Sequence, residues 1–181
     1  SVLLNSGARG RSLTQALNTG DAAMVVVDAA HSQAAVDASG GRRVISVQPV
    51  DADVTGVTDI SAAIGAASTT LPAGIRANPG LGGELSVLLF TSGTTGMPKA
   101  ARITHRRQVA AALWAAMACD LTPRSTVYCC LPLYHATGLL VAVGGALVGG
   151  SRLALAPRFS VSGFWPDVRR YGADVVFYVG E

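Results

Sequence analysis

Nine consecutive residues of this 181-residue chain combine hydroxyl groups, glycines and one cation in a pattern that suits a phosphate group. The segment T-S-G-T-T-G-M-P-K occupies residues 91–99, directly after the apolar stretch 85–90. Glycine lets a backbone bring its N–H groups close to an anion, hydroxyls donate hydrogen bonds to phosphate oxygens, and an ammonium supplies a point charge. We therefore predict an anion-binding loop. Its members are Thr91, Ser92, Gly93, Thr94, Thr95, Gly96, Pro98 and Lys99.

Lys99 is the only lysine among the 14 basic residues of the chain, and the other 13 are arginines. An ammonium differs from a guanidinium in size, hydration and hydrogen-bond geometry, so its use at this one place indicates chemistry. A stretch of Ser, Thr and Gly is also typical of a flexible surface loop, but the complete pattern favours the phosphate interpretation. The Walker A pattern does not fit, because Pro98 stands five residues after Gly93 and Ala100 follows Lys99, and the chain has no G-x-G-x-x-G.

Apolar runs that suit strands alternate with segments that suit helices, which predicts an α/β fold with a mostly parallel sheet and helices on both faces. The predicted strands are 24–27, 44–47, 85–90, 126–131, 152–156 and 173–179. The predicted helices are 31–39, a segment capped by Thr104, 139–148 and 161–170. After Thr104, an apolar stripe of Val109, Leu113 and Met117 has helical spacing. Residues 48–83 predict an irregular excursion with a short helix near 61–67.

The composition excludes several classes of protein. With 50% hydrophobic and 14% charged residues, the chain is not intrinsically disordered. Its net charge of +3 comes from scattered single and paired arginines, so we expect no nucleic-acid partner. Cys119, Cys129 and Cys130 lack metal-ligand spacing, and the adjacent pair Cys129 and Cys130 predicts buried, reduced thiols in a cytoplasmic setting. The longest apolar run, 139–148, is about half the length of a membrane-spanning helix and predicts a buried one.

The nine-residue segment resembles the signature loop of the adenylate-forming (AMP-binding) superfamily, which includes acyl-CoA synthetases, luciferases and peptide-synthetase adenylation domains. Ala100 and two further segments are similar to the fatty acid transport protein branch, the long- and very-long-chain fatty-acyl-CoA synthetases. These segments are residues 159–167 and 177–181. Residues 130–135 look like the second conserved segment of the superfamily, and residues 3–13 look like the stretch where these enzymes enter their large domain. The resemblance spans nearly the whole chain and is weakest between residues 48 and 83.

The resemblance implies a two-step reaction. A fatty acid attacks the α-phosphate of ATP·Mg to give an acyl-adenylate and pyrophosphate, and coenzyme A then displaces AMP. It assigns the outer phosphates to the loop, charge neutralisation to Lys99, and a place near the carboxylate and adenylate to His135. A histidine satisfied by local hydrogen bonds at a strand end is the alternative for His135. We expect His105 to flank a helix start and His31 to lie at the surface. We expect Tyr134, Trp114 and Trp165 to be core residues.

Three parts that the superfamily needs have no match here: a glutamate that binds Mg²⁺, an aspartate for the ribose hydroxyls, and a second catalytic lysine. The two glutamates, Glu84 and Glu181, are not in such a motif. We therefore expect residues 1–181 to be an internal part of an adenylation domain, without the C-terminal lid domain and inactive alone. Two alternatives stay open, a non-catalytic nucleotide- or acyl-binding remnant and an adenylating enzyme for another carboxylic acid. The sequence leaves open a peripheral membrane contact, the oligomeric state and the acyl chain length.

Overall fold

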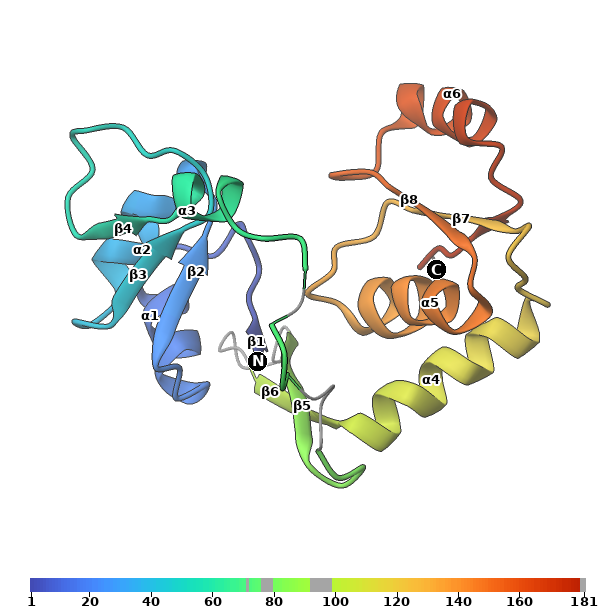
Figure 1. Ribbon diagram of the computed structural model, residues 1–181, viewed down its shortest axis with the longest axis horizontal. Coiled ribbons are helices and arrows are strands. Elements are labelled where there is room, and N and C mark those ends of the chain that lie inside the picture. The colour runs from blue at the N-terminus through green and yellow to red at the C-terminus, as the bar shows by residue number, and fades with distance from the viewer. Residues whose placement is uncertain (71, 76–79, 92–98, 180–181) are drawn as a thin grey trace. The chain divides into compact units, whose positions relative to one another are not determined.

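The computed structural model describes residues 1–70, 72–75, 80–91 and 99–179 (Figure 1). The chain divides into two compact units. The N-terminal unit is formed mainly by Val2–Pro79, and the C-terminal unit by Gly80–Thr91 and Ala101–Glu181. Residues 92–98 of the predicted anion-binding loop lie outside the described residues.

The N-terminal unit contains a parallel sheet in the order β2-β3-β4. Its elements are β1 (Val2–Leu3), α1 (Gly10–Thr19), β2 (Met24–Val27), the 3₁₀ turn η1 (Ala29–His31), α2 (Ser32–Ala38), β3 (Arg43–Ser46), β4 (Val57–Asp59) and α3 (Ser61–Gly65). The core joins α1 and α2 to the sheet through Leu13, Leu17, Val25, Ala35, Ala38 and Val44. On β2, Met24 and Val26 are exposed while Val25 is buried, so this strand has one buried face and not the two that its continuous apolar run predicted.

The C-terminal unit contains a second parallel sheet, in the order β8-β7-β9. Its elements are β5 (Leu85–Thr91), β6 (Lys99–Thr104, of which residues 101–104 belong to this unit), α4 (His105–Ala118), β7 (Thr126–Cys129), the π-helix η2 (Thr137–Val143), α5 (Gly144–Gly149), β8 (Arg152–Leu155), α6 (Val161–Tyr171) and β9 (Val175–Val176). Strands β5 and β6 are neighbours in a separate sheet. The parallel pairing confirms the predicted α/β class.

Helices cover both faces of the central strand β7, because successive side chains of a strand point to opposite sides. Val127 and Cys129 pack with Ala142 of η2 and with residues of α4 and α5 on one face. Tyr128 packs on the other face, where its ring and the Phe164 ring of α6 meet edge-on with centroids 5.6 Å apart. The tyrosine hydroxyl also donates a hydrogen bond of 3.1 Å to Asp167 of α6.

Helix α4 begins where the sequence predicted, since the Thr104 side chain accepts a hydrogen bond of 3.3 Å from the backbone N–H of Arg107. The face that it buries differs from the prediction. The helix packs against η2 and α5 through the small residues Ala112, Ala115 and Ala116. Val109, Leu113 and Met117 are exposed, because close helix–helix packing here selects alanine and glycine over larger side chains.

Two aromatic residues that we expected in the core are also exposed, Trp114 by 65% and Trp165 by 59%. Trp165 lies on α6 beside Phe164, and the two rings meet edge-on with centroids 5.1 Å apart. Helical periodicity alone did not separate the buried from the exposed face of either helix. Tyr134 is half-buried.

The other elements follow the predicted order with shifted ends. Strand β7 ends at Cys129 and not at 131, and β9 is limited to Val175–Val176. Among the described elements, three strands and one helix were not predicted. They are β1 and α1 near the start of the chain, β4 inside the segment predicted to be irregular, and β6 between the predicted loop and α4. Strand β4 is short and polar, so its pattern gives little signal, and β6 alternates poorly because arginine, alanine and threonine share its faces.

Candidate functional site

The two ends of the predicted phosphate segment lie in neighbouring strands. Thr91 is the last residue of β5, and Lys99 is the first residue of β6. Lys99 is exposed. The loop is thus flanked by a strand on each side, whereas the sequence predicted only the strand before it. The members Ser92, Gly93, Thr94, Thr95, Gly96 and Pro98 lie outside the described residues, so their roles stay predictions.

The segment that follows strand β7 forms a tight turn that carries His135. The backbone N–H of His135 donates to the carbonyl oxygen of Pro132 at 3.1 Å, and the carbonyl of His135 accepts from the N–H of Leu139 at 3.0 Å. Both backbone groups of His135 are therefore satisfied locally. Its side chain is exposed and lies against the Tyr134 ring, with ring centroids 4.6 Å apart.

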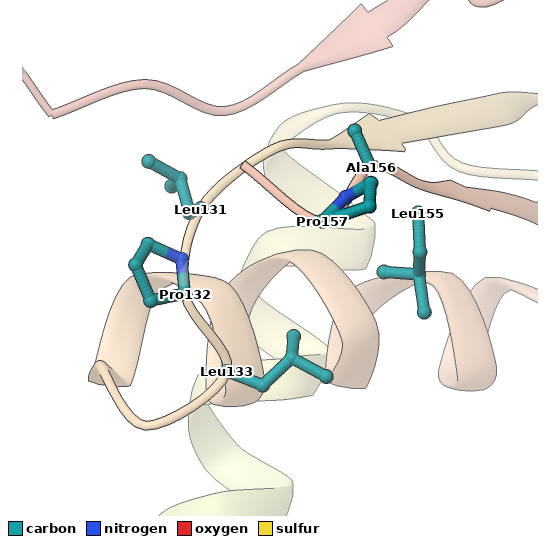
Figure 2. A pocket seen from close by; sticks show the side chains of 6 residues that line it. All are labelled: Leu131, Pro132, Leu133, Leu155, Ala156 and Pro157. Atoms are coloured by element: carbon teal, nitrogen blue, oxygen red, sulfur yellow. The ribbon is translucent and has the colours of Figure 1, made fainter. Parts of the chain in front are cut away.

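An apolar pocket of about 350 Å³ lies beside this turn (Figure 2). Two segments of the C-terminal unit line it, one directly after β7 and one at the end of β8. The lining residues are Leu131, Pro132, Leu133, Leu155, Ala156 and Pro157. A hydrogen bond of 2.9 Å from the Ala156 N–H to the Cys129 carbonyl joins the two strand ends. The pocket thus lies beyond the carboxyl ends of two paired parallel strands, which is where open α/β folds bind ligands.

The chemistry of this pocket suits hydrocarbon and not phosphate. Its lining side chains carry no charge and no hydrogen-bonding group, and Leu133 and Leu155 are 38% and 51% exposed. His135 belongs to the same turn but is not among the lining residues. The sequence analysis selected His135, whose role stays a prediction, and missed the second wall of the pocket. The signal available was a proline directly after a strand, in the segment Leu155-Ala156-Pro157.

The buried titratable groups near the pocket are poorly suited to act as nucleophiles. Burial raises the pKa of the Cys129 thiol and of the Cys130 thiol above their ordinary values. Burial, and then the hydrogen bond to Asp167, raises the pKa of Tyr128 to about 12. The two cysteines are free and buried, as predicted. The described residues therefore offer a binding surface here and no activated thiol.

The remaining two histidines lie at helix starts. His105 is the first residue of α4, as predicted. His31 is half-buried, and its Nδ1 atom lies 2.5 Å from Asp28, the residue that caps η1. No group of three or more His, Cys, Asp or Glu side chains in the described part of the chain could hold a metal ion. Within the same residues, none of the helices has the length and apolarity needed to cross a bilayer.

Comparison with protein families identifies the family of this chain. The family model described as "AMP-binding enzyme" matches residues 1–181, the whole chain. The chain belongs to the AMP-binding enzyme family. The family match therefore covers both the segment of residues 91–99 and the turn that carries His135, whose roles stay predictions.

Two relatives extend this assignment. The chain is 37% identical over 182 residues to the medium/long-chain-fatty-acid–CoA ligase FadD6 of Mycobacterium tuberculosis, covering 99% of this chain and 29% of that protein. It is 32% identical over 185 residues to long-chain fatty acid transport protein 1 of Bos taurus, covering 99% of this chain and 28% of the relative. The chain thus spans less than a third of the length of these family members.

Solved structures agree on the fold. An acyl-CoA synthetase of Brucella canis superposes with a TM-score of 0.79 at 24% identity, over 97% of this chain and 32% of that one. The ATP-bound MatB of Rhodopseudomonas palustris superposes with a TM-score of 0.74 at 27% identity, over 96% of this chain and 33% of that one. The mixed α/β arrangement of this AMP-binding chain is therefore that of adenylate-forming enzymes.

Proposed function

We propose that this chain is part of a fatty-acid–CoA ligase that activates a long-chain fatty acid with ATP and then transfers the acyl group to coenzyme A. The observation that carries the proposal is the family match over all 181 residues, with the signature T-S-G-T-T-G-M-P-K between β5 and β6. Because the chain spans less than a third of its relatives, we propose that it forms part of the adenylation domain and does not complete the reaction alone.

In the first step, a carboxylate oxygen attacks the α-phosphorus of ATP, the bond to the bridging oxygen breaks, and pyrophosphate leaves with the electron pair. Negative charge grows on the departing pyrophosphate, so donors fixed around the β- and γ-phosphates lower the barrier. The proposal gives this role to the hydroxyls and backbone N–H groups of residues 91–96 and to the ammonium of Lys99. In the second step the thiol of coenzyme A attacks the acyl carbon and AMP leaves.

The acid is proposed to be a fatty acid for two reasons. The two relatives are named for long-chain or medium/long-chain fatty acids. The pocket beside the His135 turn is also lined by apolar side chains only, which favours an alkyl chain over an amino acid or a phosphate. His135 is proposed to orient the carboxylate and not to act as a base, because the reacting carboxylate is already ionised at neutral pH.

Magnesium enters this proposal only as the partner of ATP. The metal neutralises phosphate charge when it is bound. Because neither glutamate of the chain is in a motif that matches the superfamily's Mg²⁺ ligand, that ligand is proposed to lie outside residues 1–181, and the steps above use only groups of this chain.

Isothermal titration of the chain with ATP in the presence of magnesium tests the phosphate part of the proposal. We expect weak binding that falls roughly 10- to 100-fold in Lys99→Ala, because a charge-assisted hydrogen bond is worth about 1.5–3 kcal/mol. Arg102→Ala is the matched control, since Arg102 is another exposed cation on strand β6. Binding that is equally weakened by both substitutions would show general electrostatic attraction and not a specific phosphate contact.

Acid-dependent ATP–pyrophosphate exchange tests the substrate class. It requires a polypeptide that contains this chain together with the further regions present in its relatives. Fatty acids are expected to support exchange, whereas amino acids and aryl acids are not. Exchange with amino acids but not with fatty acids would overturn the substrate class while leaving the family intact.

A further inference from the structure

Gly138 lies at the second position of the π-helix η2, where there is no room for a side chain. A Cβ atom built there would lie 2.5 Å from the Pro132 carbonyl oxygen, 3.1 Å from the Pro132 carbonyl carbon and 3.2 Å from the Leu131 carbonyl oxygen. All three atoms belong to the backbone, so no side-chain rotation can relieve the contact. The absence of a side chain at Gly138 is therefore a steric condition for the turn from Leu131 to the start of η2.

Both ways of relieving such a contact would move His135. The Pro132 oxygen is the acceptor for the His135 N–H, so a shift of Pro132 would break this hydrogen bond. A shift of η2 away from Pro132 would instead stretch the bond from the Leu139 N–H to the His135 carbonyl. His135 is thus held on both sides by groups whose spacing Gly138 sets.

The same contact also sets one wall of the apolar pocket. Leu131, Pro132 and Leu133 line that wall, and two of them supply the backbone atoms nearest to Gly138 (Figure 2). A seven-residue π-helix is rare, and π-helical turns occur often at functional sites. The unusual helix therefore begins where the pocket wall and the predicted site histidine meet.

We infer that Gly138 is a positioning residue that fixes the direction of the His135 side chain relative to the pocket wall formed by Leu131–Leu133. The inference rests on the proposed function, because the site role of His135 comes from it. The arrangement of Gly138, Pro132 and His135 can nevertheless be tested without any substrate.

Nuclear magnetic resonance of the histidine ring protons in the full chain provides the test. The chain has three histidines, and a His135→Gln variant assigns the His135 signals. The Tyr134 ring lies against the imidazole, so its ring current shifts these signals away from their positions in Tyr134→Leu. We expect Gly138→Ala to lose most of that shift.

Gly144→Ala is the matched control, because it has a similar contact in the adjoining helix α5. A Cβ atom at Gly144 would lie 2.9 Å from the Cβ of Ala112. Ala112 belongs to α4 and not to the turn that carries His135. This variant is expected to lower thermal stability while retaining the ring-current shift of His135. A Gly138→Ala variant that keeps the ring-current shift of His135 would overturn the inference.

Amide hydrogen exchange of the unaltered chain gives a second test, which does not depend on the folding of any variant. The His135 and Leu139 amides are expected to be protected, because both donate hydrogen bonds within the turn. Free exchange at both amides would refute the fixed turn. Neither measurement involves nucleotide, so loss of ATP binding would count against the proposed function alone.

Discussion

The hydrogen bond between Tyr128 and Asp167 offers a quantitative test of how β7 and α6 hold together. Tyr128→Phe removes the hydroxyl and keeps the ring that packs edge-on against Phe164 at 5.6 Å. A hydrogen bond to a charged group contributes about 1.5–3 kcal/mol. Because Asp167 is half-buried, water can hydrogen-bond to its carboxylate in the variant and offset part of this loss. We therefore expect the free energy of unfolding to fall by about 1–2 kcal/mol.

The pH dependence of this loss has a definite sign. The pKa of Tyr128 is raised to about 12 in the native chain, first by burial and then by Asp167, against about 10 in the unfolded chain. Between these values the native state keeps a proton that the unfolded state releases, so stability falls as the pH rises, by at most about 1.4 kcal/mol per pH unit. Tyr128→Phe lacks the ionisable hydroxyl and therefore this pH dependence. The difference in unfolding free energy between the variant and the unaltered chain should shrink above about pH 10.

Urea unfolding followed by tryptophan fluorescence measures both effects. The two tryptophans, Trp114 and Trp165, belong to the C-terminal unit, so the signal reports on the unit that contains the bond. Tyr171→Phe is the control, because Tyr171 is 42% exposed and its loss of a hydroxyl should change stability by less than about 0.5 kcal/mol. A Tyr128→Phe variant as stable as the unaltered chain, or a deficit that stays constant up to about pH 11.5, would refute the reasoning.

Two further predictions concern burial. Met117→Ser should change the free energy of unfolding by less than about 0.5 kcal/mol, because Met117 is 79% exposed. Ala115→Leu on the same helix should lower it by about 1–3 kcal/mol, because Ala115 is fully buried. Equal losses in urea unfolding would contradict the orientation of the helix. A thiol reagent at about pH 8 should label Cys119 before Cys129 and Cys130, since burial raises the pKa of the latter two thiols. Mass spectrometry that finds Cys129 or Cys130 labelled first would contradict this order.

The sequence predicted the elements that depend on local signals. The apolar runs of β2, β7 and β8 stood out, and the Thr104 cap marked the start of α4 correctly. The family was also accessible from residues 91–99, since nine adjacent residues carry that signature. Signals of this kind are encoded within one short segment, and no knowledge of the tertiary fold is needed to find them.

Features that depend on contacts between distant segments could not be predicted in this way. The exposed face of α4 is set by alanines that pack on η2 and α5, and not by the apolar stripe with helical spacing. The second wall of the pocket comes from Leu155 and its neighbours, some twenty residues beyond the first wall. The steric role of Gly138 exists only once the chain has turned back onto Pro132.

Strand β7 has a different neighbour on each side, and this limits how its sequence can change. Small Val127 and Cys129 fit against the alanines on one side, while the bulky Tyr128 meets Phe164 on the other. Adding or deleting a single residue would exchange the two sides and force a phenol into the space that now accepts a thiol. Insertions and deletions within this strand should therefore not be tolerated.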